Sequence, residues 1–280
     1  MASFPDAELQ KTSSLALNAV VLGAQQMTKT AVMQFEGLLP ILSLVNSEDE
    51  ECVHTGIYCL GSLAENDEVT SKLVKLGAIS AVVNQSSLGT IEVKRASGYF
   101  LALLCESPEF HAELSKQGAF ESVINLASLE DVECQEYAAF SLAHLSSNRD
   151  YQVRLVELGA LTPIVAMMST NSEPSHYASL ALLKLADNFE NHVAIAQAGG
   201  IQSLLRLGRS RATDEEVAYK SSLSVGSLAA NAVRMLPGGG DGGGKGGGLG
   251  FAAASMQAKV SGAAGRGREK TKDYLDEKAT

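Results

Sequence analysis

The chain has 280 residues, 45% of them hydrophobic and 19% charged, so it can bury a sizeable core and is not disordered throughout. Its formal net charge is −10. An acidic body repels phosphate backbones and anionic lipid, which disfavours nucleic acid or a membrane surface as the main partner and favours basic protein segments. Low aromatic content and the absence of tryptophan favour helices over strands.

The N-terminal region shows no segment that predicts secretion or membrane insertion. The apolar stretch Leu15–Leu22 is interrupted by Asn18 and preceded by Asp6 and Glu8, where a signal peptide has positive charge. The sequence contains no run of 18 apolar residues, and Ala2 stands where N-myristoylation needs glycine. We therefore expect a cytoplasmic protein.

A repeat with a nearly constant period organises the chain from Gly37 onward. Five glycines open similar segments, and the spacings between successive glycines differ by at most one residue. Five leucines each end a helical pattern and are followed three residues later by Asn or Ser. The glycines are Gly37, Gly77, Gly118, Gly159 and Gly199, and the leucines are Leu63, Leu104, Leu145, Leu185 and Leu228. A fixed period of roughly 40 residues predicts a solenoid.

Each repeat is predicted to contain three helices. The first, such as Tyr151–Leu158, ends at a glycine that can adopt the left-handed conformation. The second, such as 160–168, follows at once, and the third, such as Val132–Leu145, is the longest. Small residues recur in the third helices at Gly56, Ser97, Ala138, Ala178 and Ser221, and four residues later come Leu60, Leu101, Leu142, Leu182 and Val225. Stacking is needed to bury these positions.

The chain is divided accordingly into three parts. Residues 1–36 are predicted to be an N-terminal capping partial repeat, and residues 237–280 a glycine-rich linker with a charged tail. The repeats between them are predicted at 37–76, 77–117, 118–158, 159–198 and 199–236.

With these glycines, leucines and long third helices, the chain resembles the armadillo repeat family. The resemblance implies an all-α fold, a right-handed α-solenoid of about five repeats, and a non-catalytic scaffold or adaptor that binds other proteins. HEAT repeats are the structural alternative, disfavoured by the glycine between the first and second helices. In the armadillo family, third helices line a concave groove that holds an extended segment or a helix of the partner.

The resemblance places candidate binding residues on the third helices. Positions that match the Trp and Asn pairs of importin-α-like members are Tyr58 and Ser62, Tyr99 and Leu103, Phe140 and His144, Leu180 and Lys184, and Leu223 and Ser227. One turn earlier lie His54, Arg95, Glu136, His176 and Tyr219. Because the Asn amides are absent and Lys184 adds positive charge, a nuclear-import adaptor is less well supported than a general scaffold. A subunit of a cytoskeletal or ciliary complex is the other alternative.

No cofactor, metal or catalytic site is predicted. The tract Gly239–Lys245 satisfies the GxxxxGK string, but Gly246 replaces the Ser or Thr of a phosphate-binding loop and no strand precedes it. The five histidines fall in five segments without ligand spacing. The cysteines Cys52, Cys59, Cys105 and Cys134 show no CxxC spacing and are predicted to be reduced thiols, with Cys52 and Cys134 in the core.

Overall fold

The computed structural model describes residues 11–14, 16, 19, 37–169, 174–210 and 215–235. The predicted N-terminal cap lies almost wholly outside these residues, and so does the glycine-rich tail. The described residues form helices joined by turns, in two compact units, residues 1–145 and 146–280. This division was not predicted from the sequence, and it falls inside the helix Val132–Ser147.

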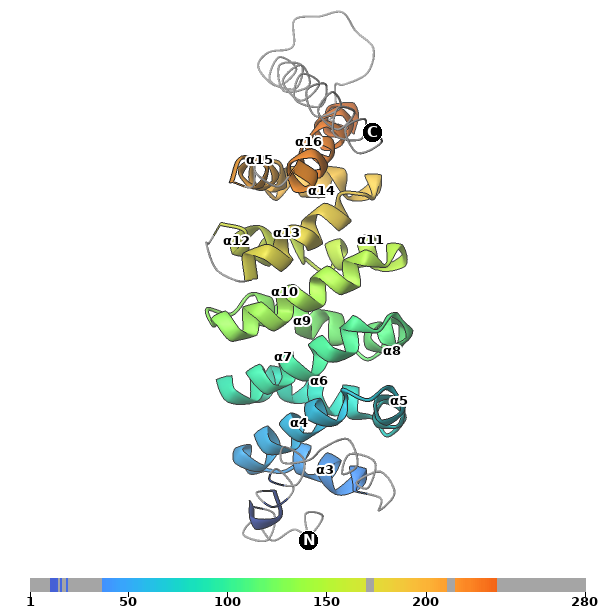
Figure 1. Cartoon of the computed structure of the whole chain (residues 1–280), viewed down its shortest axis with the longest axis vertical. Coiled ribbons are helices and arrows are strands. Elements are labelled where there is room, and N and C mark those ends of the chain that lie inside the picture. Colours follow the sequence, from blue (N-terminus) through green and yellow to red (C-terminus); the bar gives the residue numbers. More distant parts are fainter. Residues whose placement is uncertain are drawn as a thin grey trace, which may run out of the picture. The chain divides into compact units, whose positions relative to one another are not determined.

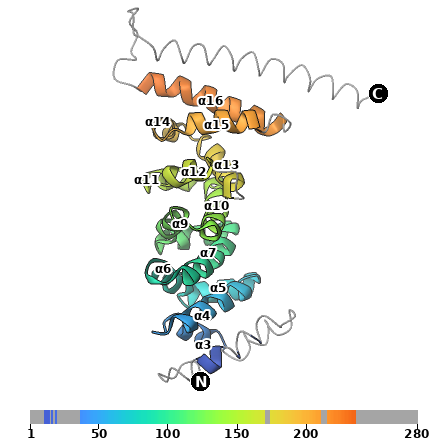
Figure 2. The ribbon, with the colours of Figure 1, turned by 90° about the vertical axis from the view of Figure 1, so that its left-hand side faces the viewer.

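Unit 1 repeats the predicted order of helices (Figure 1). Its second helices are α3 (Leu38–Val45), α6 (Ala78–Leu88) and α9 (Ala119–Ala127), and its third helices are α4 (Glu50–Leu63), α7 (Ile91–Glu106) and α10 (Val132–Ser147). Its first helices are α5 (Asp67–Lys75) and the pair η1 (Pro108–Phe110) and α8 (His111–Lys116). Figure 2 shows α7 and α10 on one side of this unit, with α6 and α9 on the other.

Unit 2 continues the same order. Its first helices are α11 (Arg149–Glu157) and the pair η2 (Phe189–Asn191) and α14 (His192–Gln197). Its second helices are α12 (Leu161–Met167) and α15 (Gly200–Ser210), and its third helices are α13 (Pro174–Leu185) and α16 (Glu215–Met235). The three helices whose bounds were predicted from sequence are found within two residues of those bounds.

The turn between first and second helices depends on glycine. Gly77, Gly118, Gly159 and Gly199 have φ values of 87°, 77°, 91° and 83°, which confirms the left-handed turn predicted for them. Gly37 differs, with φ −67° in the right-handed helical region. The sequence alignment of Gly37 with the other four therefore does not extend to its backbone conformation.

The predicted core positions of the third helices are buried. All five landmark leucines are inaccessible to solvent, and the small residues and the apolar residues four positions after them are buried as well. At Gly56 an added Cβ would lie 3.0 Å from both Leu44 Cβ and the Val45 backbone nitrogen, so a small residue is required for the close approach of α3 and α4. All four cysteines are buried and free, as expected of core thiols.

Side chains from the following helix satisfy the carbonyls that end the third helices. Thr70 Oγ1 donates to the Ala64 carbonyl at 2.9 Å, and Gln152 Nε2 to that of Ser146 at 2.9 Å. His111 and His192 Nε2 bind the carbonyls of Cys105 and Ala186 at 2.8 and 2.9 Å, and must donate because a carbonyl only accepts. The partners are six residues apart in all four cases, so these two histidines have a structural role.

Candidate functional site

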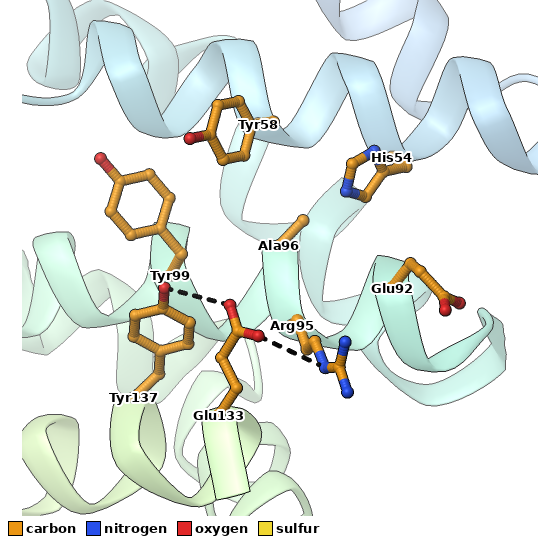
Figure 3. A pocket seen from close by; sticks show the side chains of 8 residues that line it. All are labelled: His54, Tyr58, Glu92, Arg95, Ala96, Tyr99, Glu133 and Tyr137. Atoms are coloured by element: carbon orange, nitrogen blue, oxygen red, sulfur yellow. Dashed lines mark hydrogen bonds and ion pairs between the residues drawn. The ribbon is translucent and has the colours of Figure 1, made fainter. Parts of the chain in front are cut away.

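Three tyrosine rings from successive third helices form a continuous row in unit 1. Tyr58 of α4 and Tyr99 of α7 stack with ring centroids 5.9 Å apart and planes 29° apart. Tyr99 and Tyr137 of α10 follow at 5.8 Å, with planes tilted by 56° (Figure 3). We call these three residues the tyrosine row. Tyr58 is 40% exposed, and the other two are half-buried, so the row presents aromatic surface to solvent.

Two glycines make room for this row. A Cβ on Gly61 would lie 2.5 Å from Cε1 of Tyr99, and a Cβ on Gly98 would lie 3.2 Å from Cβ of Tyr137. Each of these two tyrosines therefore packs over a glycine of the preceding third helix. A larger residue at Gly61 would displace the Tyr99 ring.

Arg95 of α7 ties the start of α10 to the row. Its Nε and one terminal nitrogen donate to the Asp131 carboxylate, with the shortest contact at 2.7 Å, and its Nε lies 3.5 Å from Glu133 Oε2. Asp131 Oδ1 also accepts from the backbone N–H of Cys134 at 2.9 Å, which caps α10. The Arg95 hydrogen bonds hold the pKa of Asp131 well below its usual range.

The phenol of Tyr137 extends this polar cluster. Its hydroxyl donates to Glu133 Oε1 at 3.4 Å. Burial, with Glu133 nearby, raises the pKa of Tyr137 to about 12, and burial also raises the pKa of Tyr99. Both phenols are therefore neutral at physiological pH and can donate hydrogen bonds.

A hollow of about 180 Å³ opens beside the tyrosine row. Figure 3 shows the three tyrosines on one side of it and His54 and Glu92 on the other. Its lining is His54, Tyr58, Glu92, Arg95, Ala96, Tyr99, Glu133 and Tyr137. The predicted residues His54, Tyr58, Arg95 and Tyr99 are thus brought together in one place.

The other predicted residues of unit 1 lie beside this hollow or away from it. Ser62 is buried and exposes little surface to a partner, while Leu103 is half-buried and Glu136 is exposed. Phe140 contacts His144, with ring centroids 4.4 Å apart, and burial lowers the pKa of His144.

In unit 2 the predicted residues whose side chains are described lie exposed on the third helices α13 and α16. His176, Leu180 and Lys184 are exposed on α13, and His176 has its ring centroid 5.4 Å from that of Tyr177. Leu223 and Ser227 are exposed on α16. The side chain of Tyr219 lies outside the described residues.

Four residues that line the hollow were not predicted from the sequence: Tyr137, Glu92, Glu133 and Ala96. The repeat period matches Tyr99 with Phe140, and Tyr137 falls three positions short of it, so alignment by the period selects Phe140 instead. Glu92 and Glu133 could have been found, since both belong to a series at the repeat period that begins at Glu51.

The described residues offer no metal centre and no membrane span. Within ranges 37–169, 174–210 and 215–235, no three His, Cys, Asp or Glu side chains are grouped so that they could hold a metal ion. None of the helices in that part of the chain combines the length and apolar composition needed to cross a bilayer.

Comparison with solved structures identifies the fold. A designed armadillo repeat protein in complex with the peptide (KR)4 matches with a TM-score of 0.68 at 24% identity, over 80% of this chain and 95% of that one. Computationally designed armadillo repeat proteins for modular peptide recognition match at 0.71 and 22% identity, over 80% and 94%. Another designed armadillo repeat protein matches at 0.70 and 22%, over 81% and 96%. The chain has the armadillo repeat fold, an α-solenoid.

Neither a protein-family model nor a curated protein sequence matches the chain.

Proposed function

We propose that this protein is a non-catalytic scaffold that binds other proteins and holds an extended segment of its partner against α4, α7 and α10. The observation that carries the proposal is the tyrosine row with its adjoining hollow. Rigid tyrosine side chains supply large contact area at low entropic cost and are favoured at binding hot spots. The designed proteins that recognise peptides have the same fold.

Charge favours a basic partner. Glu51, Glu92 and Glu133 occupy one position of three successive repeats, each at or near the start of a third helix, and all are exposed. Seven residues after Tyr58 and Tyr99 lie two further exposed glutamates, Glu65 and Glu106. Glu106 is the last residue of α7 and lies about 10 Å along that helix from Tyr99, on the same face, while Glu65 lies two residues past the end of α4. The aromatic surface is thus flanked by carboxylates on both sides.

An extended segment suits this pattern of side chains. Alternate side chains of an extended chain point in opposite directions, so a segment lying across the three helices could direct cations to both groups of glutamates. The designed protein solved in complex with (KR)4 binds a peptide in which Lys and Arg alternate, so that basic side chains point in both directions.

A peptide selection tests the proposal. The full chain is immobilised and used to select from a displayed library of random extended peptides, with the triple variant Tyr58→Ala, Tyr99→Ala and Tyr137→Ala as the comparison. We expect selected peptides rich in Lys and Arg, which bind the triple variant at least tenfold more weakly. Tyr151→Ala on α11 is the matched control and should bind as wild type does. Selected peptides that bind the triple variant unchanged, while circular dichroism shows it folded, would contradict the proposal.

A further inference from the structure

Among the third helices of unit 1, α4 and α10 begin with the same arrangement of charges. At the start of α10, Asp131 caps the helix, Glu133 follows two residues later, and Arg95 binds both carboxylates. At the start of α4, Asp49 accepts from the Cys52 N–H at 3.0 Å, and Glu51 follows two residues later. Lys11 lies 3.2 Å from Asp49 and 3.8 Å from Glu51. One cation from the preceding part of the chain thus serves an Asp and a Glu.

The helix between them, α7, has the equivalent glutamate, Glu92, but neither the capping aspartate nor the cation. Thr90 stands at its N-cap, at the repeat position that Asp49 and Asp131 occupy, and its side chain makes no capping hydrogen bond. His54 stands one repeat before Arg95, in the place of the cation. Glu92 is exposed, and no ion pair joins it to a Lys or Arg side chain in the described part of the chain.

Glu92 lines the hollow beside the tyrosine row (Figure 3). The ionised groups at this place are Arg95 with charge +1 and Glu92, Asp131 and Glu133 with charge −3 together, which leaves −2 when His54 is neutral. Because Arg95 is already bound by two carboxylates, it opposes an incoming cation only weakly. At about 180 Å³ the hollow is smaller than a typical small-molecule pocket and has room for about one long side chain.

We propose that this hollow binds one lysine or arginine side chain of the partner segment, with the cation at Glu92 and the aliphatic stem against Tyr58 and Tyr99. The partner's cation would supply for α7 the charge that Lys11 and Arg95 supply for α4 and α10. Aromatic surface beside a carboxylate suits such a side chain, since the stem packs on the rings and the cation meets the anion. This inference rests on the proposed function and identifies the subsite that binds one basic residue of the partner.

Binding of (KR)4 to the full chain, followed by fluorescence anisotropy in low salt, tests the subsite. Glu92→Gln removes the carboxylate and should weaken binding about tenfold, the size expected when one charge-assisted contact is lost. Glu109→Gln removes the same charge from η1 and should stay within about twofold of wild type. The double variant His54→Arg/Thr90→Asp copies the Arg95 and Asp131 arrangement onto α7 without changing net charge. It should weaken binding as Glu92→Gln does, because an internal cation then occupies Glu92.

The outcomes separate the subsite from the proposed function. If wild type binds (KR)4 and the tyrosine triple variant does not, but Glu92→Gln and the double variant both bind like wild type, the subsite is wrong and the binding surface stands. If Glu92→Gln and Glu109→Gln weaken binding equally, only general charge attraction acts and the subsite is likewise wrong. If wild type does not bind (KR)4 at millimolar peptide, both the proposal of a basic partner and the proposal of this subsite are wrong.

Discussion

Gly61 and Tyr99 are matched across two third helices: a Cβ on the glycine would come within 2.5 Å of the tyrosine ring. Gly61 lies inside α4, where glycine is about 1 kcal/mol less favourable than alanine. A residue that weakens its helix but admits a ring of the next one indicates that the position of the Tyr99 ring matters.

The first prediction concerns this pair. Gly61→Ala gains helix propensity but displaces the Tyr99 ring, so we expect a change in unfolding free energy of less than about 1 kcal/mol together with severalfold weaker binding of a basic peptide. Gly208→Ala is the control, because its nearest contact, Ser221 Cβ at 3.5 Å, leaves room for a methyl group. It should leave binding unchanged. Tight peptide binding by Gly61→Ala would show that the ring position is unimportant.

The second prediction concerns Asp131, which both caps α10 and binds Arg95. Asp131→Asn keeps a capping oxygen but loses the charge, whereas Asp131→Ala loses both. In urea denaturation at pH 7 we expect the alanine variant to be less stable than the asparagine variant by about 1 kcal/mol, the usual contribution of a cap. Equal stabilities would mean that the cap contributes nothing.

The pH dependence of the same residue follows from its pKa. Arg95 lowers the pKa of Asp131 in the folded protein, so the folded state holds fewer protons there than the unfolded chain near the ordinary value of about 4. The stabilisation is complete above about pH 5 and is lost as the pH falls toward the lowered folded value. The difference in stability between wild type and Asp131→Asn should therefore shrink from pH 7 to pH 3. A difference that stays constant over this range would contradict the ion pair.

The third prediction tests the histidines that satisfy helix-ending carbonyls. Gln152 makes the same bond in unit 2 that His111 makes in unit 1, so His111→Gln should cost about 1 kcal/mol or less. His111→Ala leaves the buried Cys105 carbonyl without this donor and should cost about 2 to 3 kcal/mol. His176→Ala, at an exposed position, should stay within about 0.5 kcal/mol of wild type by chemical denaturation. Equal losses for the Gln and Ala variants would rule out the shared role.

The architecture could be predicted from the sequence because the same pattern of residues recurs in each repeat. The leucines that end the third helices and the small residues that precede them recur at one period, and burial follows from that period alone. The conformation of four glycines was equally predictable, since a helix that ends at glycine and restarts at once needs a left-handed residue.

The site was less predictable, because it depends on features that do not repeat. The row continues from Tyr99 to Tyr137, because Gly98 leaves space for the Tyr137 side chain. It does not continue to Phe140, which lies one turn further along α10. Thr90 and His54 stand out only when their repeat positions are compared with Asp131 and Arg95, whose ion pair the structure reveals. The boundaries of the individual repeats stay a prediction.

The most direct measurement of the central claim is photo-cross-linking of the full chain to (KR)4 that carries a benzophenone group at one end, with the modified residues located by mass spectrometry. If an extended basic segment lies on the tyrosine row, cross-links should concentrate in Glu50–Leu63, Ile91–Glu106 and Val132–Ser147 and disappear when unlabelled peptide competes. Cross-links that concentrate instead on the first helices, Asp67–Lys75 and His111–Lys116, would contradict the account.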